Sequence, residues 1–191
     1  DTITVSSTSQ VKGAAGYLWT ASSTSVFISN DTASTTDFGF PDNQSGFDST
    51  YTITLVVSSV DGCLDTLSKT VTIYRRPIAN FTMPAAACAP SALNPIDLST
   101  GNTLSYSWSI TPNITITGGS SNNPTFNFPV TTNDSLVYLI NLLVLDANGC
   151  ADEFDLNYTV YPKPTADFTP SLMDSCGPVS VTFINMSFSG Q

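Results

Sequence analysis

Alternating apolar and polar side chains are the clearest structural signal along this chain. Residues 51–57 alternate and then become fully apolar, and residues 138–145 carry a similar run. Each run is followed by a turn that contains Gly and then by a second alternating run, at residues 67–74 and 154–161. This pattern predicts antiparallel hairpins, and no stretch shows the 3.6-residue period of a helix. We therefore expect an all-β fold.

The chain repeats itself at a fixed spacing. The shared marks are a Tyr-x-Trp run, a Phe-x-Phe-Pro run, a Gly-Cys-x-Asp turn, a closing Tyr and a lone Cys. Their offsets run from 87 residues, for Tyr74 and Tyr161, to 89 residues, for Trp19 and Trp108. A period of this size suits a seven-stranded immunoglobulin-like sandwich of about 100 residues. Five matches at one spacing predict tandem sandwiches laid end to end.

The repeat frame divides the chain into three parts. Residues 1–76 form a repeat that lacks its first strand and begins at the strand from Ile3 to Ser7. Residues 77–162 form a complete repeat. Residues 163–191 supply the first two strands of a third, Ala166 to Thr169 and Val179 to Asn185. Because a sandwich without all its strands exposes its core, we expect the parent polypeptide to continue in both directions.

Composition narrows the classes of partner. Hydrophobic residues make up 41% of the chain and charged residues only 10%, and the net charge is −10. An acidic field of this kind repels phosphate backbones, so we expect no nucleic-acid partner. No run approaches the roughly 18 apolar residues of a membrane span. Pro-rich junctions at Arg75 to Pro77 and Tyr161 to Pro164 predict semi-rigid joints between repeats.

Several motifs carry a resemblance to a known family. They are the Pro-x-Ala-x-Phe opening, Cys before Val-x-Val-x-Phe-x-Asn-x-Ser, Tyr-x-Trp, the Asn-Gly-Cys-x-Asp turn and the closing Thr-Val-x-x-Tyr-Pro-Lys-Pro. Together they resemble the PKD-type immunoglobulin-like repeats of Bacteroidetes surface proteins over essentially the whole chain. The chain departs from that family in one place, since the Trp-x-Phe-Gly-Asp-Gly turn is missing.

The resemblance implies an extracellular, cell-surface role. Long arrays of such repeats resemble giant adhesins, including those of gliding motility, which are exported by the type IX secretion system. It implies as partners the neighbouring repeats, the secretion or motility machinery, and surface polysaccharide or a host or substratum ligand. We expect a structural or adhesive stalk. Two alternatives stay open: a glycan-binding accessory module of a secreted hydrolase or protease, and a filament subunit completed by neighbouring chains.

The sequence contains few of the groups that catalysis requires. The chain has no His, so Ser-His-Asp and Cys-His nucleophile arrangements cannot be built. No Gly-rich phosphate loop or zinc spacing is present either. We predict that this segment is not an enzyme and has no cofactor. The aromatic faces of Trp19 and Trp108 could stack on sugars, but their place in the repeat favours the buried tryptophan of the third strand.

Carboxylates surround both hairpin turns, and they are Asp61, Asp65, Asp146, Asp152, Glu153 and Asp155. Calcium prefers six to eight oxygen ligands, and a calcium ion between repeats would stiffen a stalk. No EF-hand-like ligand spacing is present, however. We therefore favour solvated acidic turns over a calcium site.

The four cysteines, Cys63, Cys88, Cys150 and Cys176, are candidates for disulfides, with buried thiols as the plainer alternative. Cys88 and Cys150 are the one pair inside the complete repeat. In an immunoglobulin-like topology these two positions lie at opposite ends of the sandwich, whereas a disulfide needs Cα atoms within about 7 Å. The second pairing is a staple between neighbours, from Cys88 to the turn of the third repeat and from Cys150 to a cysteine before residue 1. Both pairings stay open.

The resemblance also implies O-glycosylation, because Bacteroidetes surface proteins are modified at Asp-Ser/Thr before a small or apolar residue. Five such triplets occur, where composition alone predicts roughly two. The candidate sites are Thr2, Thr32, Ser49, Thr66 and Ser135.

Overall fold

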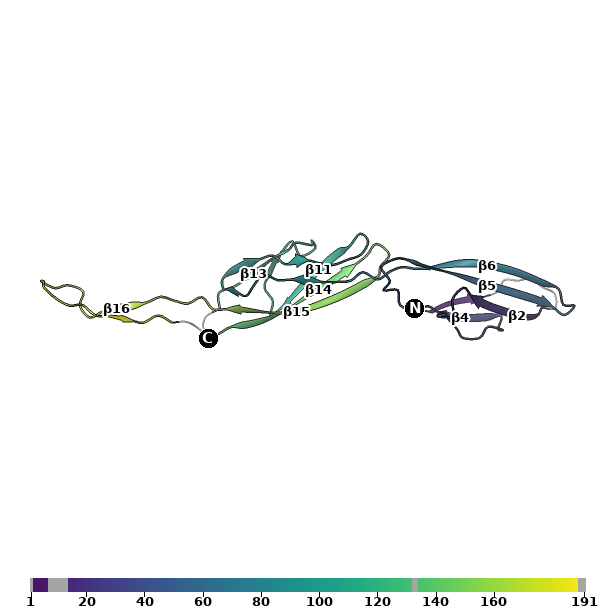
Figure 1. The fold of residues 1–191 in the computed structure, drawn as a ribbon, viewed down its shortest axis with the longest axis horizontal. Helices are drawn as coiled ribbons and strands as arrows, with labels where there is room; N and C mark the ends of the chain where they lie inside the picture. Colours follow the sequence, from purple (N-terminus) through teal and green to yellow (C-terminus); the bar gives the residue numbers. More distant parts are fainter. Residues whose placement is uncertain (1, 7–13, 132–133, 189–191) are drawn as a thin grey trace. The chain divides into compact units, whose positions relative to one another are not determined.

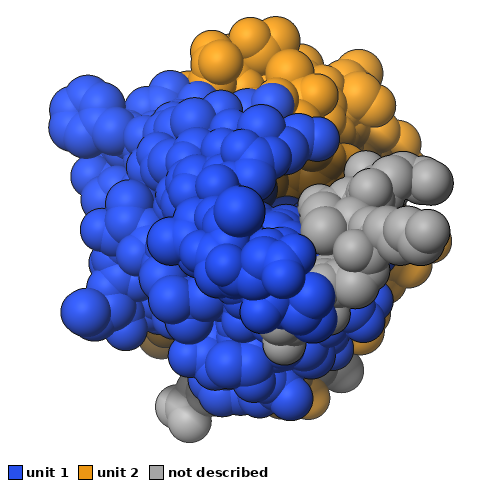
Figure 2. Space-filling model, turned by 90° about the vertical axis from the view of Figure 1, so that its right-hand side faces the viewer, with its two compact units in different colours: residues 1–76 blue, residues 77–191 orange. Residues whose placement is uncertain are grey.

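The chain forms two compact units, residues 1–76 and 77–191, in a computed structural model that describes residues 2–6, 14–131 and 134–188. Figure 2 shows the first unit in blue and the second in orange. The described residues form strands and no helix, so no helical segment among them could cross a membrane. The predicted all-β fold of tandem immunoglobulin-like sandwiches is confirmed.

The described residues of unit 1 form a sandwich of two three-stranded sheets, ordered β1-β4-β3 and β2-β5-β6 (Figure 1). The strands are β1 (Thr2–Ser6), β2 (Ala14–Ala21), β3 (Phe27–Ile28), β4 (Thr35–Gly39), β5 (Ser49–Ser59) and β6 (Leu64–Ile73). Its core joins the two sheets, because Trp19 of β2 packs edge-on against Phe38 of β4 with ring centroids 6.0 Å apart.

Unit 2 contains a fuller sandwich. One sheet has the order β11-β14-β15-β8, and the facing strands form the pair β10-β7 and the three-stranded sheet β12-β13-β9. The strands are β7 (Phe81–Thr82), β8 (Ala87–Cys88), β9 (Ser91–Leu93), β10 (Ile96–Asp97), β11 (Ser105–Thr111), β12 (Thr115–Thr117), β13 (Thr125–Phe128), β14 (Leu136–Leu145) and β15 (Ala151–Tyr161).

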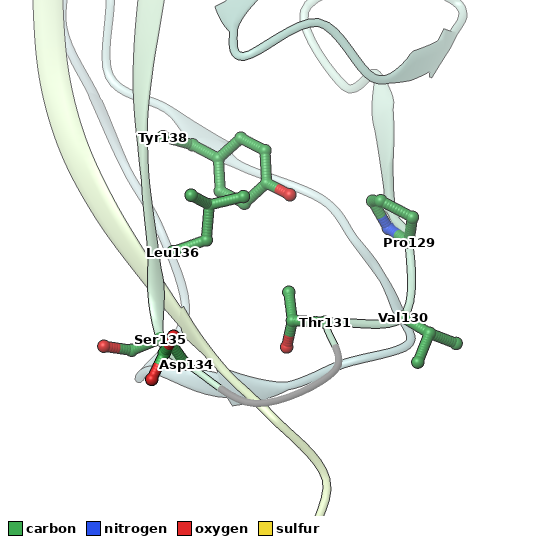
Figure 3. Close-up of a pocket in the computed structure, with 7 residues that line it drawn as sticks. All are labelled: Pro129, Val130, Thr131, Asp134, Ser135, Leu136 and Tyr138. Atoms are coloured by element: carbon green, nitrogen blue, oxygen red, sulfur yellow. The ribbon is translucent and has the colours of Figure 1, made fainter. Parts of the chain in front are cut away.

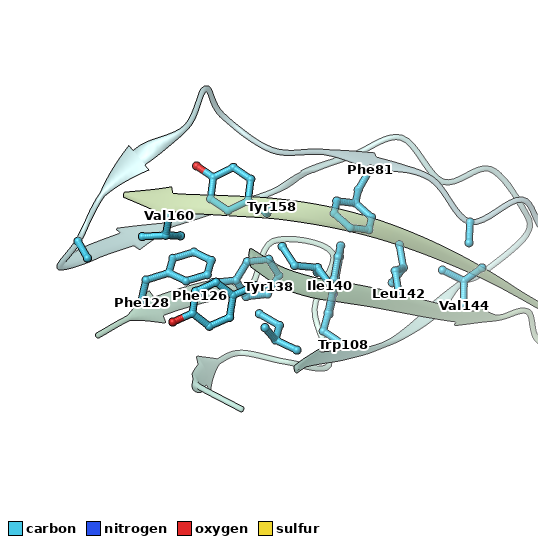
Figure 4. Packing of buried hydrophobic residues seen from close by; sticks show 13 residues of the cluster. Phe81, Trp108, Phe126, Phe128, Tyr138, Ile140, Leu142, Val144, Tyr158 and Val160 are labelled. Atoms are coloured by element: carbon cyan, nitrogen blue, oxygen red, sulfur yellow. The ribbon is translucent and has the colours of Figure 1, made fainter. Parts of the chain in front are cut away.

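An aromatic cluster fills this sandwich (Figure 4). Phe81 of β7 meets Trp108 of β11 at 4.8 Å, and Trp108 meets Phe126 of β13 at 5.5 Å, in edge-to-face geometry. Such pairs add about 0.5–1.5 kcal/mol each beyond the burial of their area. Alternation along β14 places Tyr138, Ile140, Leu142 and Val144 in the core, since successive side chains of a strand point to opposite faces.

The long hairpins agree with the sequence pattern. β5 pairs with β6 and β14 pairs with β15, and both pairs are antiparallel. Each of these strands covers all or most of the residues predicted for it. The strand predicted from Ile3 to Ser7 is β1, and Ser7 lies outside the described residues.

Unit 2 ends with a two-stranded hairpin of β16 (Phe168–Pro170) and β17 (Phe183–Asn185). Both strands are shorter than predicted, since residues 166–167 and 179–182 form no strand. The assignment of residues 163–191 to a third repeat stays a prediction.

Candidate functional site

The turns of the hairpins β5–β6 and β14–β15 share one construction. Gly62 and Gly149 adopt positive φ values of 81° and 83°, which L side chains rarely adopt, so the turn requires glycine at this place. In each turn the glycine N–H donates to a carbonyl three residues back, that of Ser59 or that of Asp146.

Asp146 is part of that turn rather than a solvated carboxylate. Its side chain is only 7% exposed, and Oδ1 accepts the N–H groups of Asn148, at 2.8 Å, and Cys150, at 3.0 Å. In unit 1 the equivalent residue is Ser59, whose hydroxyl accepts the N–H of Cys63 at 3.1 Å. The prediction of a solvated acidic turn was therefore wrong for Asp146, because backbone N–H groups stabilise its carboxylate locally.

The remaining carboxylates do not gather into a metal site. Asp152 accepts the backbone N–H of Ala79 at 2.9 Å, and Asp155 accepts the amide of Asn141 at 2.8 Å. Asp65 accepts the N–H of Thr66. Across residues 2–6, 14–131 and 134–188, no group of three or more His, Cys, Asp or Glu side chains could hold an ion.

Cys88 and Cys150 lie at opposite ends of the long strand β15. Cys88 pairs with Tyr161 at the end of β15, whereas Cys150 immediately precedes its first residue, Ala151. The 11 residues of β15 span about 33 Å at roughly 3.3 Å per residue. Figure 4 shows Val160 and Val144 at opposite ends of the core; Val160 pairs with Ala87, next to Cys88, and Val144 pairs with Asp152, near the turn. A bond between Cys88 and Cys150 would require this unit to unfold.

Three of the four thiols are open to solvent. Cys63, Cys88 and Cys176 are exposed, and Cys150 is half-buried. Pairing with a cysteine outside the same sandwich is sterically open to each of the exposed three.

Four of the five candidate glycosylation sites are exposed. Thr2 begins β1, Thr66 lies on the edge strand β6, and Thr32 follows β3, where its hydroxyl donates to Asn30 Oδ1 at 3.0 Å. Ser135 precedes β14 and is exposed, whereas Ser49 opens β5 and is half-buried. Asp1, the first residue of one triplet, lies outside the described residues.

A shallow pocket of about 340 Å³ lies beside Ser135 (Figure 3). Its described lining includes Asp134, the hydroxyl of Thr131 and the ring of Tyr138. Burial raises the pKa of Tyr138 above its usual value, which keeps the phenol neutral. Since Asp134 is the one charged group of this lining, the pocket offers no paired acid and base.

Both tryptophans belong to the cores, as predicted. Trp19 and Trp108 are 5% and 7% exposed, and their indole N–H groups donate to the carbonyls of Ala33 and Ser121 at 2.8 and 2.9 Å. Their rings therefore have no open face for a sugar.

Comparisons with known proteins give structural likeness at low identity. No family model matches the chain, and no curated protein matches it. Protocadherin Gamma B2 extracellular cadherin domains 3-6 match at 9% identity and a TM-score of 0.46, over 91% of this chain and 49% of that one. Mouse cadherin-23 EC22-24 matches at 12% identity and 0.31, over 77% and 53%, and human CDH23 EC21-23 at 11% and 0.35, over 91% and 69%. The chain thus spans about half the length of the first two structures.

Proposed function

We propose that this chain is a stalk segment of an extracellular multi-repeat surface protein, with a structural or adhesive role. The observation that carries the proposal is the 87-to-89-residue repeat, which recurs as sandwiches that each close their own aromatic core. Modules of this kind supply reach and mechanical strength because each one folds around its own contacts.

The construction of the loops supports the same role. The turn glycines, the Asp146 carboxylate and the tryptophan N–H groups all satisfy neighbouring backbone groups. These polar groups hold strands and loops in place. A glycan-binding accessory module has no comparable observation in its favour, since both tryptophan rings are buried.

Single-molecule force spectroscopy on the full chain tests the stalk. We expect the two units to unfold in separate steps, and residues 77–162 to release roughly 300 Å of chain at up to about 3.6 Å per residue. Rupture forces should be equal in calcium and in a chelator, because we expect no calcium site. A single rupture of the whole chain would contradict the proposal.

The finer assignment rests on the sequence motifs. We propose a PKD-type repeat of a Bacteroidetes adhesin, exported by type IX secretion and used in attachment or gliding. In such a protein Thr2, Thr32, Ser49, Thr66 and Ser135 would carry O-glycans, and the exposed positions of four of them support this. Staples between neighbouring repeats through the four cysteines fit the separation of Cys88 from Cys150 along β15.

A further inference from the structure

The turn of the hairpin β14–β15 contains a chemically reactive pair of residues, Asn148 and Gly149. It is the one Asn-Gly pair in the 191-residue sequence, and both residues are exposed. Glycine has no Cβ, so its backbone nitrogen can approach a neighbouring side chain closely. Apart from its chain neighbours, nothing lies within 4 Å of the place where a Cβ of Gly149 would be. Solvent therefore reaches this pair of residues.

The two hairpin turns each contain one carboxylate among their four residues, but at different places. Residues 59–62 are Ser-Val-Asp-Gly, and residues 146–149 are Asp-Ala-Asn-Gly. A neutral first residue thus goes with a charged third residue, and a charged first residue goes with a neutral third residue. Conversion of Asn148 to aspartate would place two like charges in one turn, a combination that unit 1 avoids and that electrostatic repulsion disfavours.

Asp146 fixes the backbone on both sides of Asn148. Its Oδ1 accepts the Asn148 N–H at 2.8 Å, and its backbone carbonyl accepts the Gly149 N–H at 3.1 Å. For the Gly149 nitrogen to attack the Asn148 side chain, it must turn away from this carbonyl and toward Cγ. The closed turn therefore prevents the attack, and the reaction requires the turn to open.

We propose that Asn148 is a site of spontaneous deamidation, and that the hydrogen bonds of Asp146 slow this reaction by keeping the turn closed. In the open turn, hydroxide removes the proton of the Gly149 N–H, and the nitrogen attacks the Asn148 Cγ. The side-chain nitrogen takes a proton from water and leaves as ammonia, while a five-membered succinimide ring closes. Water then opens the ring at one of its two carbonyls and gives aspartate or isoaspartate. The inference does not rest on the proposed stalk role.

Both products alter the turn. Aspartate adds a carboxylate close to that of Asp146, which is only 7% exposed. Isoaspartate also inserts a methylene group into the main chain between the N–H groups of residues 148 and 150, the two donors that Asp146 Oδ1 accepts. We therefore expect the hairpin β14–β15 to become less stable as the protein ages.

Peptide mapping of the 191-residue chain over time, at mildly alkaline pH, tests the proposal. The peptide that contains Asn148 should deamidate slowly in the folded protein and faster in urea, where the turn is open. In the folded protein Asp146→Ala should raise the rate by roughly ten- to a hundredfold, because two N–H groups lose their acceptor and the turn opens more often. In urea the variant and the parent chain should react at the same rate.

The matched control is Ser59→Ala, which removes the corresponding acceptor from the turn of unit 1. We expect it to leave the rate at Asn148 unchanged. The proposal is overturned by an Asn148 peptide that stays intact in urea, by a folded Asp146→Ala protein that reacts no faster than the parent chain, or by equal acceleration in Ser59→Ala. Equal rates in the folded and the urea-unfolded parent chain would also overturn it, and this comparison decides the question even where Asp146→Ala does not fold.

Discussion

In each core, a few residues both fill the interior and hold a loop through a hydrogen bond. The ring of Trp108 fills the sandwich while its N–H holds the loop that contains Ser121. Tyr158 does the same, since its hydroxyl donates to the carbonyl of Ala85 at 3.0 Å. The recurrence of Tyr-x-Trp was enough to predict the buried tryptophans. The loop carbonyls that they hold were not predictable, because loop conformation carries no periodic signal.

Tyr106 makes the stability of unit 2 depend on pH in the alkaline range. Burial, helped by the nearby Asp97 carboxylate, raises its pKa to about 12. A phenol has a pKa of about 10 in an unfolded chain. The folded state therefore holds the proton more tightly, and this contribution to stability is complete below about pH 10 and is lost as pH rises toward 12.

We expect Tyr106→Phe to lose less stability than the parent chain between pH 9 and 11.5, as measured by urea unfolding with hydrogen exchange resolved by unit. The difference in stability between the two proteins at pH 7 measures the effect of the substitution on packing. Identical losses across the alkaline range would contradict the assignment.

Long elements were predictable and short ones were not. The strands β5, β6, β14 and β15 each contain ten or more residues, so alternation identified them and their partners. Strands such as β8 and β10 have two residues each, too few to show any period. Their places are set by long-range partners such as Tyr161, which local sequence does not reveal.

The turn between β14 and β15 should be weakened strongly by the loss of one carboxylate. We expect Asp146→Ala to destabilise unit 2 by about 1–3 kcal/mol, because two part-buried N–H groups lose their acceptor. Ser59→Ala is the matched change in unit 1 and removes a single acceptor, so its effect should be smaller. Unit-resolved hydrogen exchange measures both, and equal effects would show that Asp146 has no special role.

At the scale of the molecule, the repeat period predicted tandem sandwiches before any geometry was known. The immunoglobulin-like topology placed Cys88 and Cys150 at opposite ends of the sandwich, but it left their pairing open because it does not give the offset between strands. The length of β15 supplies that information by separating Cys88 from Cys150.

Mass spectrometry of the protein purified from its own host tests the modifications together. We expect a mass above that of the bare polypeptide, with additions on peptides that contain Thr2, Thr32, Thr66 or Ser135. In a non-reducing peptide map, Cys88 and Cys150 should each be linked to peptides from other repeats. A Cys88–Cys150 peptide, or a mass equal to the bare chain, would contradict the corresponding part of the proposal.

Lys69 has a consequence for how such a chain folds during synthesis. It lies opposite Ile53, at the place where the complete repeat has the partly buried Leu156 opposite Ile140. If β6 were exchanged for β15, Lys69 would replace a partly buried apolar side chain, which disfavours the exchange. Similar neighbours on one ribosome-bound chain are prone to exchange strands. A charge at this place thus disfavours the wrong assembly of strands.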